Sequence, residues 1–100
     1  MIRLTEVCEL LDSTKTIKRK YTLREVYINP EHIISLREDP LYEKKMLEGH
    51  LPKGLDSRQR FTRLTLSRGN TGMEIVVVGA PQIIQDNLEK FEKERRILHG

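Results

Sequence analysis

Residues 61–78 read FTRLTLSRGNTGMEIVVV, and this stretch decides the fold. Residues 61–67 and 73–78 are rich in β-branched and apolar side chains, which favour strands. The segment GNTG at residues 69–72 lies between them. Glycine and asparagine readily adopt the positive φ angles that tight hairpin turns need. The sequence therefore predicts a β-hairpin in this stretch.

The second strand of this hairpin is apolar on four consecutive residues, 75–78 (IVVV). Successive side chains of a strand point to opposite faces, so both faces are expected to be covered. Residues 79–81 (GAP) break the strand, and the proline is predicted to begin a helix that runs to about residue 97. Its buried side is expected to carry Ile84, Leu88 and Phe91. This helix covers one face of the strand, and a curled sheet or a partner subunit is expected to cover the other.

The first third of the chain carries three further strand patterns. Apolar residues nearly alternate with polar ones over residues 2–7, and a second pattern covers residues 21–28. Pro30 ends the second strand because it cannot donate a ladder hydrogen bond. A short third strand is predicted over residues 32–36.

The stretch 37–59 is predicted to be an insertion between two strands. Asp39 is a suitable N-cap, and Pro40 suits the first position of a helix. A short helix is therefore expected around residues 40–48, with Gly49 as its C-terminal stop. A loop that contains a proline and a glycine follows it.

Together these patterns predict one α+β domain over residues 1–100. It has about five short, mostly antiparallel strands, a C-terminal helix and the short inserted helix. The strands are expected to form either a curved sheet or a half-open barrel with the long helix across it.

Composition excludes several classes of protein. The longest apolar run, residues 75–78, is far shorter than the roughly 20 residues of a membrane-spanning helix. No apolar stretch of the kind found in signal peptides follows Met1. The single cysteine, Cys8, cannot form an internal disulfide, which fits a reducing compartment. We therefore expect a cytoplasmic protein that does not enter a membrane.

The net charge of +3 is concentrated in two basic segments. Their basic residues are Lys15, Lys18, Arg19, Lys20, Arg58, Arg60, Arg63 and Arg68. One hypothesis makes these residues an anion-binding surface for single-stranded nucleic acid or a small nucleotide, with Tyr21 stacking on a base. The alternative is that they are solvated strand and loop residues.

No pattern of catalytic or metal-binding residues is found. His32, His50 and His99 are far apart and lack ligand partners at helical spacing. No base is visible near Cys8, and residues 69–72 lack the lysine of a phosphate-binding loop. We expect no enzymatic activity, no metal and no cofactor.

Three parts of the chain show a resemblance to a known family. They are residues 1–5 (MIRLT), 26–34 (VYINPEHII) and 61–66 (FTRLTL), followed by a glycine turn, a valine-rich strand and a helix. In this order they resemble the small FlbD-like proteins, which are named for flagellar and swarming motility and have short counterparts in phages. The resemblance implies a small, β-rich, non-enzymatic accessory protein and supplies no catalytic residues.

The leading hypothesis is a non-enzymatic, regulatory interaction module that binds a protein partner and associates with itself. The doubly apolar strand at residues 75–78 and the charged insertion motivate it. The residues expected to contact the partner are Leu41, Tyr42, Met46 and Leu47, on the inserted helix. Anion binding by the two basic segments is the alternative hypothesis.

Overall fold

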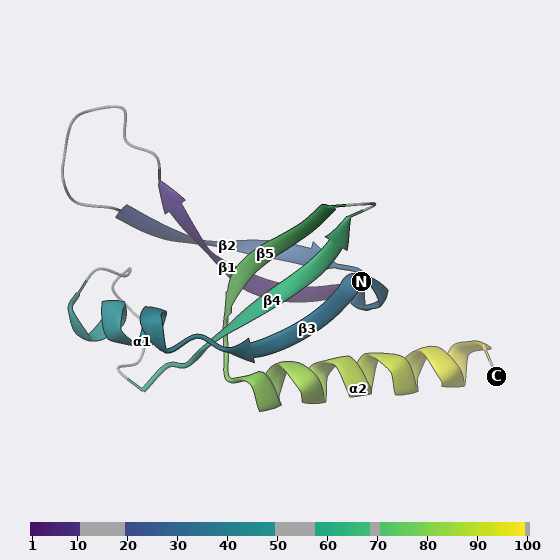
Figure 1. Ribbon diagram of the computed structural model, residues 1–100. Coiled ribbons are helices and arrows are strands. Elements are labelled where there is room, and N and C mark those ends of the chain that lie inside the picture. Colours follow the sequence, from purple (N-terminus) through teal and green to yellow (C-terminus); the bar gives the residue numbers. More distant parts are fainter. Residues whose placement is uncertain (11–19, 50–57, 69–70, 100) are drawn as a thin grey trace.

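The computed structural model describes residues 1–10, 20–49, 58–68 and 71–99. Five strands form one antiparallel sheet in the order β2-β1-β5-β4-β3 (Figure 1). They are β1 Ile2–Leu10, β2 Lys20–Ile28, β3 Ile33–Glu38, β4 Phe61–Arg68 and β5 Thr71–Val78. The 3-10 turn η1 Pro30–His32 and the helices α1 Pro40–Leu47 and α2 Pro81–His99 complete the described elements. The predicted α+β fold is confirmed, and the sheet is open.

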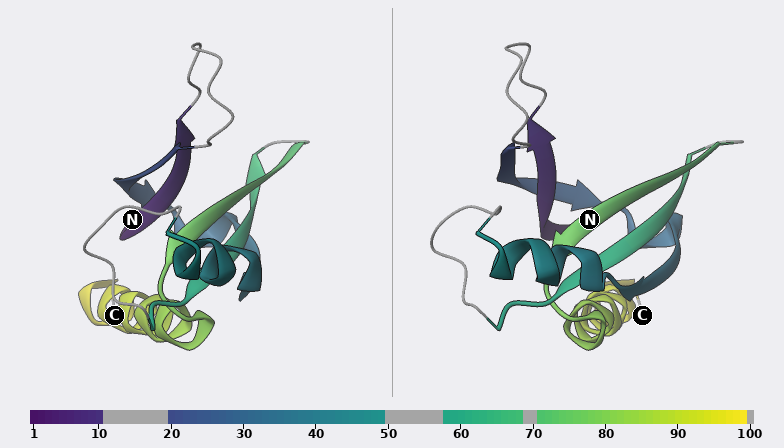
Figure 2. Two further views of the ribbon diagram at one scale, coloured as in Figure 1. Left: turned by 90° about the vertical axis from the view of Figure 1, so that its left-hand side faces the viewer. Right: turned by 60° about the vertical axis from the view of Figure 1, so that its left-hand side comes forward.

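Strand β5 is covered on both faces, as its sequence predicts. Ile75 and Val77 belong to a first core that also contains Ile84 of α2. Val76 belongs to a second core, against which Tyr42 and Met46 of α1 pack. The two helices therefore lie on opposite faces of the sheet (Figure 2). Helix α1, together with Val7 of β1 and Tyr21 of β2, covers the second face of β5. The sequence had left open whether a curled sheet or a partner subunit would cover this face.

A glycine sets the position of α2 on the sheet. Gly79 has a φ of +122°, which side chains rarely tolerate, and it lies between β5 and the helix. Its N–H donates to the carbonyl of Arg60 at 2.8 Å, and its carbonyl accepts from the Thr62 hydroxyl at 2.7 Å. The corner is thereby fixed to β4, and Ile84 is placed in the first core.

Helix α1 begins and ends where its sequence predicts. The Asp39 carboxylate accepts from the backbone N–H of Leu41 at 3.1 Å, which is an N-cap, and Pro40 occupies the first turn. Gly49 follows the helix with a φ of +79°. Helix α1 packs against the second core through Tyr42 and Met46, so this part of the predicted insertion belongs to the packed fold. Residues 50–57 of the predicted insertion lie outside the described residues.

Several predicted boundaries differ by a few residues. Arg37 and Glu38 continue β3, because they pair with Arg63 and Thr62 across the sheet. Thr71 and Gly72, expected in the hairpin turn, belong to β5. The partners that extend β3 are distant in sequence, whereas Thr71 and Gly72 pair with Arg68 and Ser67 of the neighbouring strand.

Candidate functional site

A groove of about 420 Å³, lined mostly by apolar surface, opens between the described strands and is named here the apolar groove. Strand β2 contributes Arg24, Val26, Tyr27 and Ile28, and strands β4 and β5 contribute Leu66, Ser67, Met73 and Ile75. Met1, Glu6, Asn29 and His32 complete its lining. Its volume lies within the range of about 300–1,000 Å³ that is typical of ligand pockets.

The groove follows from how the two hairpins meet. Strands β1 and β5 pair only at Glu6–Val77 and Val7–Val76. Strands β2 and β4 line the same groove although β1 and β5 lie between them in the sheet. The sheet must therefore curve around the groove, and the curvature brings together residues from opposite ends of the chain.

Large side chains remain accessible around the groove. Met1, Tyr27 and Met73 are 74%, 59% and 43% exposed. Tyrosine, methionine and arginine are enriched in protein–protein interfaces, and methionine adapts to irregular apolar partners. An apolar groove with such a rim suits the burial of a partner's apolar side chains.

The charged residues of the groove wall neutralise each other. Nε of Arg24 donates to Oε1 of Glu6 at 3.3 Å, and these two residues come from paired strands. The side chain of Arg24 is exposed, whereas that of Glu6 is largely covered. A ligand in the groove therefore does not need to carry a charge.

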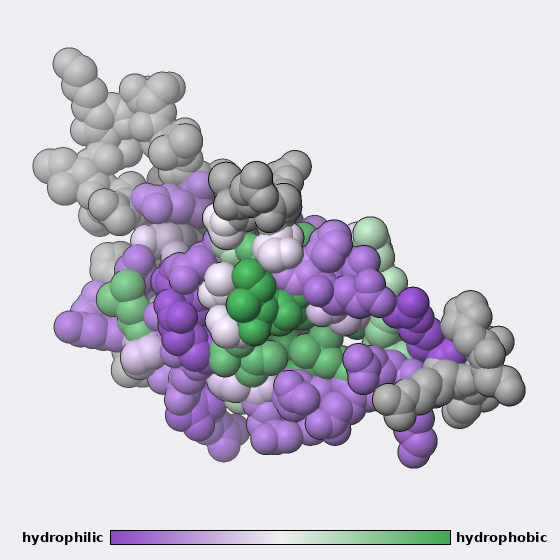
Figure 3. Space-filling model, turned by 45° about the vertical axis from the view of Figure 1, so that its right-hand side comes forward, coloured by the Kyte–Doolittle hydropathy of each residue, from purple (hydrophilic) through white to green (hydrophobic). Residues whose placement is uncertain are grey.

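A second hollow, of about 370 Å³, lies between β3 and α2. It is more polar than the apolar groove, because Gln85, Glu89 and Glu92 line it beside Ile33 and Ile34. In the view of Figure 3, apolar side chains gather near the middle of the face, with hydrophilic ones around them.

Two arginines of the second basic segment, Arg60 and Arg63, are neutralised by carboxylates. Arg63 donates through Nε and Nη2 to Oδ2 of Asp39, at 3.0 and 2.7 Å, and through Nη1 to Glu74 at 3.0 Å. The hydrogen bond to Asp39 is the main cause that raises the pKa of the Arg63 guanidinium. Arg60 contacts Glu38 and Glu43. These two arginines form internal ion pairs and do not make a net positive patch.

The other basic residues have different outcomes. Lys15, Lys18 and Arg19 lie outside the described residues, and only the backbone of Lys20 and Arg68 is described. Arg58 is exposed and lines a small pocket with Arg60. Anion binding by the first basic segment stays a prediction.

Tyr21 has no free ring to stack on a base. It is buried in the second core, where its ring meets that of Tyr42 edge-on at 5.8 Å between centroids. Its hydroxyl accepts from Lys45 Nζ at 2.7 Å, and the same ammonium lies 4.7 Å from the centre of the Tyr42 ring. The stacking role expected for Tyr21 is therefore wrong.

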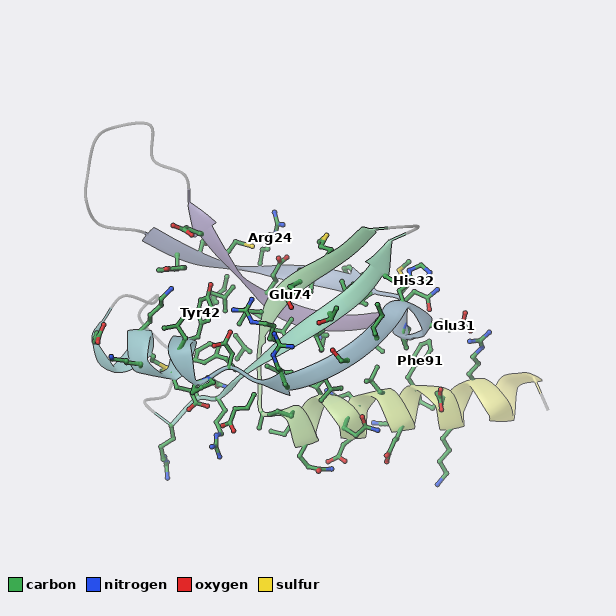
Figure 4. The ribbon with its side chains drawn as sticks, in the orientation of Figure 1. Arg24, Glu31, His32, Tyr42, Glu74 and Phe91 are labelled. Carbon is green, nitrogen blue, oxygen red and sulfur yellow. The ribbon has the colours of Figure 1, made fainter. Side chains whose placement is uncertain are left out.

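Two of the four partner-contacting residues expected on α1 serve the core. Tyr42 and Met46 pack against the second core, and Tyr42 lies between α1 and the sheet (Figure 4). Burial is also the main cause that raises the pKa of the Tyr42 hydroxyl. Leu41 is exposed, and the side chain of Leu47 is outside the described set. The apolar residues Tyr42 and Met46 of this short helix therefore pack within the chain.

The sequence contained a weak sign of the apolar groove that was missed. Tyr27 and Met73 are apolar residues on strands, and both stay exposed. Their positions relative to each other depend on the curvature of the sheet, which strand patterns do not reveal.

Cys8 is partly buried on β1, and burial is the main cause that raises the pKa of its thiol, with the charge of Glu6 adding to it. A raised pKa lowers the thiolate fraction at neutral pH. We expect iodoacetamide to modify Cys8 several-fold more slowly than it modifies glutathione at neutral pH, as followed by mass spectrometry. Unfolding the chain in urea should abolish the difference. A rate equal to that of glutathione in the native protein would contradict this prediction.

Two other findings concern only the described residues. No cluster of three or more histidine, cysteine, aspartate or glutamate side chains is arranged to hold a metal ion there. No helix in that part of the chain is long and apolar enough to cross a membrane. Comparisons of the chain with protein-family models, with curated proteins and with solved structures found no match.

Proposed function

We propose that this protein is a non-enzymatic interaction module that regulates a protein partner by binding it, and that it also associates with itself. The apolar groove receives an uncharged, apolar segment of the partner polypeptide. The observation that carries the proposal is the exposure of Met1, Tyr27 and Met73 around an apolar hollow in a curved sheet.

The character of the groove supports a polypeptide occupant. Its charged pair, Arg24 and Glu6, is internally satisfied, so an apolar segment can bind without an unpaired charge. Its rim consists of the residue types that interfaces favour. The anion-binding alternative has less support, because Arg60 and Arg63 already contact carboxylates.

A selection from a library of random peptides displayed on phage tests this proposal. We expect the selected peptides to carry clusters of apolar residues. The Met73→Glu variant should bind them about tenfold or more weakly, because a charge would then face the apolar segment. Affinity is measured by fluorescence polarisation of a labelled peptide from the selection.

The matched control is Ile34→Glu, which places the same charge on a large exposed apolar residue outside the groove. It should leave the affinity unchanged, and circular dichroism should show both variants folded. Equal losses in the two variants, a loss in Ile34→Glu alone, or a selection without apolar enrichment would refute the groove as the binding site.

A further inference from the structure

The two edges of the sheet differ in how well they are protected. Strand β3 has six residues and a register shift between Ile33 and Ser35, both of which hinder pairing with another strand. Strand β2 has nine residues, all paired with β1 in one unbroken register, and contains no proline. Within the described chain no strand pairs with the outer edge of β2. A long regular edge of this kind is a template for strand addition.

We infer that two copies of this chain pair through β2, antiparallel about a two-fold axis at Leu23, to form one continuous sheet. The inference rests on the self-association in the proposed function and concerns the outer edge of β2, whose Arg24 and Val26 also line the apolar groove. In such an interface the same surface serves both copies, so each residue that contacts another is contacted by it in return.

Charge selects the register. Antiparallel pairing about a two-fold axis places one residue opposite its own copy, and three such registers pair seven or more residues of β2. An axis at Arg24 sets two arginines opposite each other, and an axis at Glu25 sets two glutamates opposite each other. Like charges directly opposite are destabilising. The axis at Leu23 instead sets two leucines together and pairs residues 20–26.

The Leu23 register also gives the remaining charged residues suitable neighbours. Glu25 comes opposite Tyr21 of the second copy, where Lys45 donates to the tyrosine hydroxyl. The carboxylate thus approaches an ammonium group, which favours a second copy of this chain as the occupant. Arg24 comes opposite Thr22 of the second copy, a neutral residue.

Cysteine cross-linking tests this register in a Cys8→Ser background. Side chains directly opposite have Cβ atoms about 4.5–5.5 Å apart, so Leu23→Cys should form an intermolecular disulfide under mild oxidation. The matched control is Glu25→Cys, whose two copies would be offset by about 13 Å along the strands and should stay reduced. Size-exclusion chromatography with light scattering of the unaltered chain should give the mass of two chains, and Met73→Glu should retain it.

Each other result overturns the inference and leaves a distinct conclusion. A monomer at high concentration overturns self-association as a whole. A dimer that cross-links through Glu25→Cys supports self-association but excludes the Leu23 register. A dimer that cross-links through neither cysteine supports self-association but excludes pairing through the edge of β2. Peptide binding in the groove is measured separately, by fluorescence polarisation, so failure of the β2 pairing and failure of the groove proposal can be told apart.

Discussion

Replacing Phe61 with alanine is expected to lower the free energy of unfolding by about 3–5 kcal/mol. Phe61 is completely buried in the second core, and its ring centroid lies 6.1 Å from that of Tyr42 on α1. The substitution leaves a cavity between the sheet and α1, and the surrounding structure relaxes only partly around such a cavity. Urea denaturation followed by circular dichroism measures the loss.

A loss of this size is a large part of the roughly 5–15 kcal/mol that stabilises a typical domain, so a milder variant is measured beside it. Phe61→Leu keeps most of the volume and should cost clearly less than alanine. The control is Ile83→Ala, at an exposed apolar residue of α2. A cost for Phe61→Ala as small as that for Ile83→Ala would contradict the assignment of α1 to the core.

The second large effect is expected at Asp39. Replacing it with alanine should lower the free energy of unfolding by about 2–4 kcal/mol, since it removes an N-cap and leaves a half-buried arginine without its main partner. Asp39 is only 5% exposed, and it accepts both from Leu41 N–H and from two nitrogens of Arg63. Arg63 would retain Glu74. Urea denaturation is again the measurement.

The matched control is Glu38→Ala, one residue earlier. Glu38 pairs with Arg60, and both side chains are well exposed, so the cost should stay below about 1 kcal/mol. In the double variant Asp39→Ala with Arg63→Met, part of the loss should be recovered, because the unpaired guanidinium is gone. If the two single substitutions lower the free energy of unfolding equally, burial of the Asp39–Arg63 pair contributes nothing to stability.

The sequence predicted the elements that local patterns determine. The antiparallel pair β4 and β5, the doubly apolar strand at residues 75–78 and the helix begun by Pro81 all appear in the structure. So does the cap of α1 by Asp39. Each of these depends on side chains within a few residues of one another, which is the range in which turn and capping chemistry acts. Residues 69–70 of the predicted turn lie outside the described residues.

The function of α1 depended on contacts that no local pattern contains. Tyr42 and Met46 lie at positions that suit either a docking helix or a core helix. The residues that decide between these, Val7, Tyr21 and Phe61, come from three other strands. An apolar stripe on a short helix indicates that the stripe is buried, but it does not indicate which part of the molecule buries it.

Charge sums along the sequence likewise did not predict which basic residues are neutralised. Arg60 and Arg63 belong to a segment that is basic by count, yet their carboxylate partners lie well away in sequence, at Asp39, Glu43 and Glu74 among others. Cross-strand register and the position of α1 bring these partners together. The apolar groove escaped prediction likewise, because it depends on the curvature of the sheet.

The most direct measurement for the groove is methyl NMR of the unaltered protein during titration with an apolar peptide selected from the library. We expect the largest shift changes at methyl groups of Val26, Ile28, Leu66, Met73 and Ile75, which line the groove. The methyl groups of Ile34 and Ile83, exposed elsewhere, should stay unchanged. Changes centred on Ile34 or Ile83, with the groove methyl groups unaffected, would contradict the proposed binding site.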